Sequence, residues 1–448
     1  MSDVLAARAQ MAMSLAFHIV FAVIGIAMPV LMVLAERRWQ RTGDPVALEL
    51  AKRWAKGTAV LFAVGAVSGT VLSFELGLLW PGFMEWAGPI IGMPFSLEGF
   101  AFFTEAIFLG IYLYGWDRIS RRAHLWSGIA VAVSGAVSGI FVVIANAWMN
   151  APTGFRLVDG RPVDIDPIAA LQTPAAFSQT LHMTLAAYAA TGLAAAGVHA
   201  LFLLRGRDRV FHATALRIAL LVGIPASLLQ PVSGHLSAQF VARHQPVKLA
   251  AMEGHWETEA RAPLRIGGWP DAAREETRWS IAIPGALSFL AFDDVNATVR
   301  GLKDVPRDER PPVAVTHLAF QLMVGLGVAM MAVSLWALVP LVRRRDLAQQ
   351  RRLLLALVAC APMGFVAVEA GWVVTEVGRQ PWIIHGVMRT ADAVTPMPGL
   401  AVPFALFTAL YVLLSIVTAI ILGRQMLVAP RAVGRPRGAP VAVPVAGD

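Results

Sequence analysis

Nine long apolar stretches constrain this chain more than any other feature of its sequence. A bilayer-spanning helix needs about 20 mostly apolar residues. Stretches of this kind lie at roughly 9–35, 57–79, 94–115, 125–149, 177–204, 216–238, 316–342, 353–377 and 398–423. With 57% apolar and only 15% charged residues, the 448-residue chain has more apolar surface than one soluble core needs. We therefore predict an all-α integral membrane protein of nine transmembrane helices arranged in bundles.

The basic residues alternate between the two sides of the predicted bundle. Of the 37 Lys and Arg residues, 22 follow the first, third, fifth, seventh and ninth spans. By the positive-inside rule, these connections and the C-terminus are cytoplasmic and the N-terminus faces outward. These Lys and Arg residues set the topology and also contact anionic lipid, which accounts for the net charge of +8. We therefore expect no nucleic-acid partner. The first stretch is too long for a secretory signal and lacks a small-residue cleavage site, so we expect it to be retained.

The chain divides into four predicted regions. Residues 1–238 carry spans one to six, and residues 316–425 carry spans seven to nine. Between them, 239–315 forms a polar outer loop with seven prolines and three tryptophans. Loops of this length are usually functional or disordered, and the aromatic content favours a loop folded against the bundle. The final segment, 426–448, is rich in Pro, Gly and Ala, which predicts a disordered cytoplasmic tail.

The cysteine content limits the cofactors that the chain can hold. Cys360 is the only cysteine, so an internal disulfide framework and a c-type haem attachment motif are both excluded. Iron–sulfur clusters held by several cysteines are excluded as well. A redox cofactor must therefore be held by His, Met or carboxylate ligands.

Ionisable residues inside the spans are few, and such residues suggest function by default. The candidates are His18, Glu98, Glu105, His182, His199, His235, Glu369 and Glu376. At 1.5 Å per residue, five donors fall within roughly 15 Å of the outer surface. These five are His18, Glu98, His182, Met323 and Glu369. Five helices that place donors in one layer are what a shared cofactor would produce.

Haem chemistry fits these donor types. A His and Met pair closes both axial positions of haem iron, whereas a single His or Glu leaves one position open for oxygen. Each residue also has a structural interpretation. A lone helical His is more often packed than a ligand, and most Met fill cores. Glu98 and Glu105 share a helix face, which could be a proton route or a helix contact. Glu369 in mid-span must be protonated, paired or bound to metal.

Other redox classes fail on the histidine inventory. A haem–copper oxidase needs about six intramembrane His with a neighbouring pair for copper, and the sequence has no adjacent His pair. Quinol–cytochrome c reductases need two His pairs about fourteen residues apart. His182 and His199 are seventeen apart, and no second pair exists. Two further classes stay open: a haem-free transporter with a carboxylate proton relay, and a cytochrome that passes electrons to a partner without touching oxygen. The lack of an internal repeat counts against the transporter.

Seven segments resemble subunit I of cytochrome bd-type quinol oxidases, in the same order along nearly the whole chain. They are Ala16–His18, Glu98–Glu105, Gly115–Arg118, Asn146–Met149, Lys248–Glu253, Val368–Trp372 and Gly378–Trp382. The resemblance implies that the chain is the haem-bearing subunit of a quinol:oxygen oxidoreductase. It implies that His182 and Met323 ligate a low-spin b haem. His18 and Glu369 would each ligate one of two high-spin haems, with Glu98 beside them.

The resemblance also assigns roles to the remaining candidates. Lys248 and Glu253 would bind ubiquinol or menaquinol in the outer loop. Glu105 and Glu98 would carry protons inward from an entrance near Lys56. Arg379 would serve haem propionates or fix the local fold. Oxygen is then reduced to water, with charge separation across the membrane.

The sequence departs from many members of this family at Gln321, where they carry Arg. The seven-residue spacing of Glu98 and Glu105 is one shorter than in some members, and the outer loop lacks a long insertion. These features resemble the short-loop, cyanide-insensitive branch, in which a b haem can replace haem d. The expected cofactors are low-spin haem b, high-spin haem b and haem d or a second b haem. The expected partners are a second membrane subunit and a small single-helix subunit, in the bacterial cytoplasmic (inner) membrane.

Overall fold

The computed structural model describes residues 2–427 and confirms the nine predicted spans. Within that range, nine helical segments are long and apolar enough to cross a membrane. The long helices are α1 (Asp3–Thr42), α2 (Pro45–Leu79), α3 (Pro81–Tyr114), α4 (Arg121–Asn150), α6 (Ala176–Leu204), α7 (Arg209–His244), α10 (Val313–Val342), α11 (Arg351–Cys360), α12 (Met363–Val377) and α14 (Ala401–Leu427). The predicted tail of 426–448 lies almost entirely outside the described residues.

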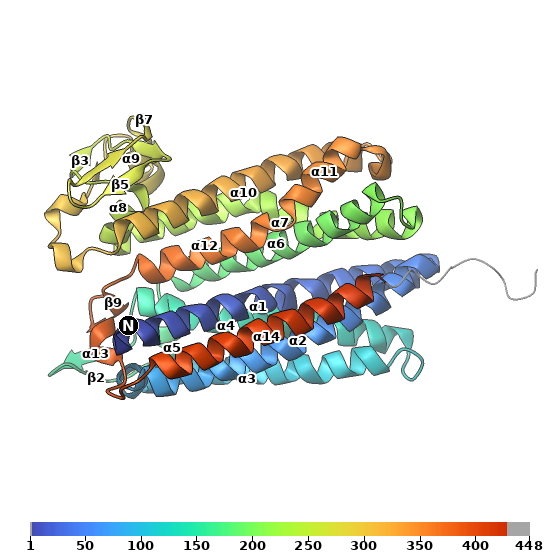
Figure 1. Cartoon of the computed structure of the whole chain (residues 1–448), viewed down its shortest axis with the longest axis horizontal. Coiled ribbons are helices and arrows are strands. Elements are labelled where there is room, and N and C mark those ends of the chain that lie inside the picture. Colours follow the sequence, from blue (N-terminus) through green and yellow to red (C-terminus); the bar gives the residue numbers. More distant parts are fainter. Residues whose placement is uncertain (1, 428–448) are drawn as a thin grey trace, which may run out of the picture.

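The helices form two bundles that lie side by side (Figure 1). One contains α1–α4, with α14 packed on α1 and α2. The other contains α6, α7, α10 and the α11–α12 pair, and it meets the first mainly through α1 and α4 against α6. We call the end that carries residues 245–312 the loop end and the opposite end the basic end. The N-terminus lies at the loop end (Figure 1).

The start of α1 is tied to the start of the last described helix, α14, at the loop end. The Asp3 carboxylate accepts hydrogen bonds from the backbone amides of Gly399 and Leu400, at 3.0 and 2.9 Å. These amides immediately precede α14, so a side chain of α1 satisfies donors that open the last helix. The bond links residues that are nearly 400 positions apart in sequence.

The eighth span is two helices rather than one. α11 ends at Cys360 and α12 begins at Met363, with Ala361 and Pro362 between them. Proline has no backbone N–H and clashes with the preceding turn, which interrupts a helix at this position. The interruption lies one to two turns before Glu369 and has no counterpart of the same kind among the other described spans.

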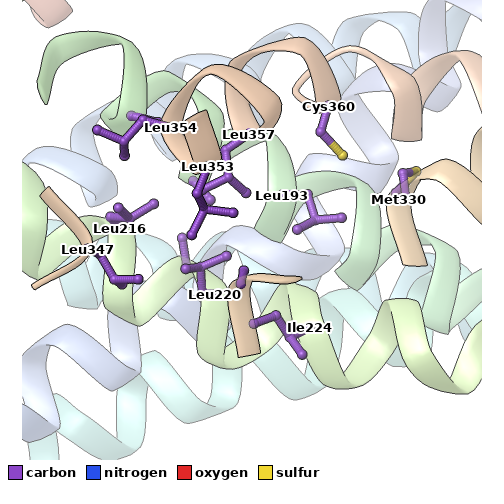
Figure 2. Close-up of a cluster of buried hydrophobic side chains, with 14 of the residues drawn as sticks. Leu193, Leu216, Leu220, Ile224, Met330, Leu347, Leu353, Leu354, Leu357 and Cys360 are labelled. Carbon is purple, nitrogen blue, oxygen red and sulfur yellow. The ribbon is translucent and has the colours of Figure 1, made fainter. Parts of the chain in front are cut away.

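A large apolar core holds the second bundle together. Figure 2 shows Leu193, Leu216, Leu220 and Leu357 converging from α6, α7 and α11. α6 and α7 approach each other closely because two glycines face one another. A Cβ atom added to Gly192 would lie 2.6 Å from the Gly223 backbone, so only glycine fits there.

The segment between α7 and α10 is folded, as the sequence predicts, but it adds strands to an otherwise helical chain. It contains α8 (Pro246–Glu253), α9 (Ala286–Phe292) and two 3₁₀ turns, Leu302–Asp304 and Arg307–Glu309. Its strands pair antiparallel as β3 (Glu259–Ala260) with β8 (Thr298–Val299), β4 (Leu264–Ile266) with β7 (Ile281–Ile283), and β5 (Trp269–Asp271) with β6 (Glu276–Arg278). It occupies 245–312 rather than 239–315, because α7 and α10 continue past the apolar stretches.

Smaller elements complete the two ends. At the loop end lie β1 (Arg156–Val158) paired with β2 (Arg161–Val163), and β9 (Trp382–Ile384) paired with β10 (Met388–Arg389). The short helices α5 (Pro167–Leu171) and α13 (Thr390–Ala393) lie at the same end. A 3₁₀ turn, Leu347–Gln349, precedes α11.

Candidate functional site

Three of the predicted donors flank one apolar cluster between the two bundles. We call this the central cluster; its buried members are Ile19, Val23, Ile26, Ala187 and Ala190. Ile19 follows His18 on α1. Met183 follows His182 on α6, Val368 precedes Glu369 on α12, and both pack on the central cluster. The helix segments that carry His18, His182 and Glu369 therefore pack on the same apolar cluster.

His18 on α1 faces α2. Its Nδ1 lies 2.9 Å from the hydroxyl of Ser68, a residue that is completely buried. A Cβ atom on the next residue, Gly69, would lie 3.0 Å from the His18 ring. The imidazole is therefore held edge-on against α2, with one nitrogen bonded.

His182 on α6 faces α7 in a similar way. Its Nδ1 lies 3.0 Å from the hydroxyl of buried Ser233. The Gln230 side-chain amide nitrogen lies 3.2 Å from Nε2 and 3.3 Å from Nδ1, and it also bonds the His182 carbonyl. A Cβ atom on Gly234 would lie 3.6 Å from the ring.

Met323 lies against the Gly371 face of α12, and Glu369, two residues earlier on α12, points to a different face of that helix. The Met323 sulfur on α10 would lie 3.0 Å from a Cβ atom on Gly371, two residues after Glu369. Glu369 has a buried Oε1 that has no hydrogen-bond partner. A buried carboxylate oxygen without a partner is destabilising unless something else binds it.

The five donors occupy a thicker layer than the sequence predicts. His182 lies six residues after the start of α6, whereas Glu98 lies seventeen after the start of α3. At 1.5 Å per residue this corresponds to roughly 9–26 Å from the loop-end helix termini. The difference arises because several helices extend beyond the apolar stretches from which depth was counted.

Glu98 and Glu105 form a stripe on α3 that faces small residues of α4. The Ser138 hydroxyl donates to Glu98 Oε1 at 3.2 Å. A Cβ atom on Gly135 would lie 3.1 Å from the Glu105 carboxyl group, and Glu105 is only 5% exposed. Glu105 is thus enclosed between two helices, and Glu98 is partly buried on the same face, as the seven-residue spacing predicts.

A web of polar side chains joins α4, α8 and α12 at the loop end. Lys248 Nζ on α8 donates to Asn150 Oδ1 at 2.6 Å. Glu376 accepts from Asn146 at 2.5 Å and from Arg379 at 2.6 Å. Burial, with the Arg379 charge nearby, lowers the pKa of Lys248 well below its usual range. We call these residues, together with His385, the outer cluster.

His385 adds a titratable group that the sequence did not single out. Its backbone N–H donates to the Met149 carbonyl at 2.9 Å, and its Nδ1 is buried without a partner. Burial, then the Lys248 and Arg379 charges, lower the pKa of His385 to about 4. The outer cluster is therefore a place where proton affinities differ strongly from those in water.

Glu253 lies at the end of α8, next to His255 and Arg265. All three have buried side-chain atoms without hydrogen-bond partners. Burial raises the pKa of Glu253 to about 8, against the opposing Arg265 charge. Gln321, which departs from the family pattern, bonds the backbone at Arg265 and Gly267 and fixes the strands beside this group.

Other candidates lie away from the central cluster. His199 bonds His212 at 2.9 Å towards the basic end, and His235 lies 3.5 Å from Asp293 at the loop end. Lys56 is exposed on α2. Among residues 2–427, no group of three or more His, Cys, Asp or Glu side chains could hold a bare metal ion.

Sequence reasoning missed two buried acids. Glu75 on α2 accepts from Gln10 and Ser14, both at 2.9 Å, and its position inside an apolar stretch was an available signal. Glu36 lies 2.9 Å from His124 Nδ1 at the basic end. That pair joins residues 88 positions apart, which no sequence pattern indicates.

Comparison with known proteins agrees with this arrangement. The family model for cytochrome bd terminal oxidase subunit I matches residues 6–430. A Bacillus subtilis (strain 168) protein provisionally named cytochrome bd menaquinol oxidase subunit I is 39% identical over 421 residues, 92% of this chain and 94% of that protein. The cytochrome bd ubiquinol oxidase subunit 1 of the same strain is 33% identical over 407 residues, 88% of this chain and 87% of that protein.

A solved structure extends the likeness to three dimensions. The bd oxidase from Geobacillus thermodenitrificans matches with a TM-score of 0.90 and 39% sequence identity, covering 95% of this chain and 98% of the other. The nine spans, the donors around the central cluster and these relatives lead to one conclusion. The chain belongs to the cytochrome bd terminal oxidase subunit I family, the haem-bearing catalytic subunits of quinol oxidases.

Proposed function

We propose that this chain oxidises quinol at its loop end and reduces dioxygen to water beside the central cluster. The observation that carries the proposal is that the chain neighbours of His18, His182 and Glu369 pack on one apolar cluster, from three helices. When bound, the haems supply the one-electron chemistry that connects the two half-reactions. The residues of the chain hold those groups and move the protons.

The donor set fits haem iron. His182 and Met323 would hold a low-spin b haem through a nitrogen and a sulfur, and that haem would act as an electron carrier. His18 and Glu369 would each hold a high-spin haem. The unpartnered Glu369 Oε1 supports this assignment.

Lys248 and Glu253 bind quinol in this proposal. Both lie on α8, which is buried between the long helices and the strands of the loop end. Glu253 accepts a quinol proton, because a carboxyl group with a pKa of about 8 exchanges protons near neutral pH. Lys248 orients a quinol oxygen, and the Arg379–Glu376 pair fixes the surrounding backbone.

Protons for oxygen reduction travel along the stripe on α3. Glu105 takes them from the basic end, and Glu98, held by Ser138, delivers them to the central cluster. With the basic end in the cytoplasm, quinol protons leave on one side and oxygen takes protons from the other. This separates charge without a pump.

We place the chain in the bacterial cytoplasmic membrane, beside a second membrane subunit and a small accessory helix. The quinol is ubiquinol or menaquinol; the names of the two Bacillus relatives contain both. Large apolar side chains exposed on α3, such as Phe100 and Phe103, support contact with lipid or with another subunit.

The test is a reduced-minus-oxidised visible spectrum with haem extraction, on the purified complex and on His182→Ala. We expect His182→Ala to lose the low-spin band, and the control His199→Ala to keep it. A far-red chlorin band places haem d in the complex, and b haem alone indicates the branch without haem d. A folded wild-type complex without haem would contradict the proposal and favour a transport role for the intramembrane carboxylates.

A second measurement separates the oxidase from a cytochrome that merely relays electrons. His18→Ala and Glu369→Ala should abolish oxygen consumption while the low-spin band remains. Unchanged oxygen consumption in both variants would contradict the oxygen-reducing role.

A further inference from the structure

Each histidine of the proposed haem site contacts a Ser–Gly pair on the next long helix. His18 faces Ser68–Gly69 on α2, and His182 faces Ser233–Gly234 on α7. The two helix pairs, α1–α2 and α6–α7, belong to different bundles. The same arrangement therefore occurs twice, with no shared residues.

The direction of each hydrogen bond follows from where the serine proton goes. The Ser68 hydroxyl donates to the Val64 or Gly65 carbonyl, at 3.0 and 3.1 Å, and the Ser233 hydroxyl donates to the Gln230 carbonyl at 2.9 Å. A hydroxyl has one proton. With that proton given to the carbonyl, each serine oxygen accepts from the histidine, and Nδ1 then carries the hydrogen.

A neutral imidazole with hydrogen on Nδ1 has its lone pair on Nε2. At His182, the Gln230 amide nitrogen lies 3.2 Å from Nε2 and 3.3 Å from Nδ1 and also donates to the His182 carbonyl, so the serine bond, and not Gln230, selects the tautomer. We infer that Ser68 and Ser233 are positioning residues that fix the tautomer and ring plane of His18 and His182, so that each presents Nε2 to haem iron. This inference rests on the proposed haem ligation.

The glycine after each serine gives the ring its space. On α2 a Cβ atom would come within 3.0 Å of the His18 ring, so the fit is tight. On α7 the corresponding distance is 3.6 Å, which is ordinary contact. Both serines are almost completely buried, at 0% and 1% exposure, so the hydroxyl has little competition from water.

The hydrogen bond has an electronic consequence. An imidazole that donates through its other nitrogen is a stronger ligand, and a stronger ligand stabilises ferric over ferrous iron. Loss of the bond should therefore raise the reduction potential of the haem bound by that histidine. Since the two sites share no residues, each serine should affect one haem only.

The experiment is a potentiometric titration of the purified complex, followed by visible and electron paramagnetic resonance spectra. Ser233→Ala should raise the potential of the low-spin haem and broaden its ferric resonance, while the high-spin haems stay as in wild type. Ser68→Ala should raise the potential of the high-spin haem held by His18, while the low-spin haem stays as in wild type. Ser233→Thr and Ser68→Thr keep a hydroxyl that can make both bonds, so they should restore the wild-type potentials.

Matched controls come from the same helices. Ser73 on α2 and Ser237 on α7 also donate to backbone carbonyls but contact neither histidine. Ser73→Ala and Ser237→Ala should leave every potential unchanged.

Two failures are distinguishable. If His182→Ala loses the low-spin haem but Ser233→Ala leaves its potential and resonance unchanged, the inference is overturned and the proposed function stands. The same holds if threonine fails to restore what alanine removes. If His182→Ala keeps the low-spin haem, the proposed ligation itself is wrong.

Discussion

The proposed donors next to the central cluster and the polar residues of the outer cluster differ in the groups that contact them. Around the central cluster, His18 and His182 are each bonded by a neutral hydroxyl, and Glu369 keeps an oxygen unpartnered. In the outer cluster, charged groups contact one another directly. The comparison teaches that the two histidines proposed as cofactor ligands are bonded by groups that add no charge. In the outer cluster, the proton affinities of Lys248 and His385 are set by burial and by neighbouring charges.

Met323→Leu should have the largest effect on the proposed low-spin haem site. Leucine keeps the volume but removes the sulfur, so the low-spin signature should disappear. Turnover should fall by more than the about 10–100-fold typical for loss of an outer partner of a ligand. The spectrum and oxygen uptake of the purified complex test this, with Met330→Leu as the control in the apolar core of the same helix. A retained low-spin band would show that another residue is the ligand.

Glu253→Gln should damage quinol oxidation while leaving the haem spectrum intact. Only the carboxylate form can accept a proton, and the pKa of Glu253 is about 8. Wild-type quinol oxidation should therefore rise as pH increases through about 8. The variant should be about 100-fold or more slower, as is typical for loss of a general base, and should lack this rise. Steady-state rates against pH measure both; an unchanged profile would remove Glu253 from the proton path.

Glu376→Ala should destabilise the loop end. The Arg379 side chain is only 2% exposed, so removing its partner leaves a buried charge uncompensated, which costs about 3–5 kcal/mol. Thermal unfolding of the detergent-solubilised complex should show this as a lower midpoint. Glu309→Ala, which removes a 3.9 Å contact with Arg389, should change stability by less than about 1 kcal/mol. Equal effects of the two variants would mean that the outer cluster is not held by this pair.

Gly69→Ala and Gly234→Ala compare the two histidine sites directly. The added methyl would lie 3.0 Å from the His18 ring but 3.6 Å from the His182 ring. We expect Gly69→Ala to reduce the high-spin haem content and Gly234→Ala to leave the low-spin haem at its wild-type level. Haem extraction and spectra on both variants measure this difference in haem content, which is the smallest of the effects predicted. Equal loss in both would contradict the geometric difference.

The sequence predicts the spans and the donor list because both depend on single residues or on short runs. Hydropathy locates nine spans. An ionisable residue inside a span can be recognised from the sequence even when its contact partner is unknown. The hydroxyls of Ser68 and Ser233 are not predictable in this way, because they lie 50 and 51 residues from the histidines they bond. The outer cluster was missed in part for the same reason: Asn150 and Lys248 are 98 residues apart.

The positions of the helix ends were the other main difference between the prediction and the structure. α7 continues to His244 and α10 begins at Val313, past the ends of the apolar runs. Hydropathy reports where a helix meets lipid, whereas backbone hydrogen bonding continues into polar residues that pack on the loop-end strands. The same extension placed the donors deeper than was counted from the sequence.

The hydrogen bonds from Gly399 and Leu400 to Asp3 have a consequence for biosynthesis. α1 enters the membrane first, yet its residue Asp3 bonds Gly399 and Leu400, which are translated nearly 400 residues later. Contacts between such distant residues form late, so this bond forms only after the segment that opens α14 has been made. A chain truncated before α14 would therefore lack the bond that ties the start of α1 to the last described helix.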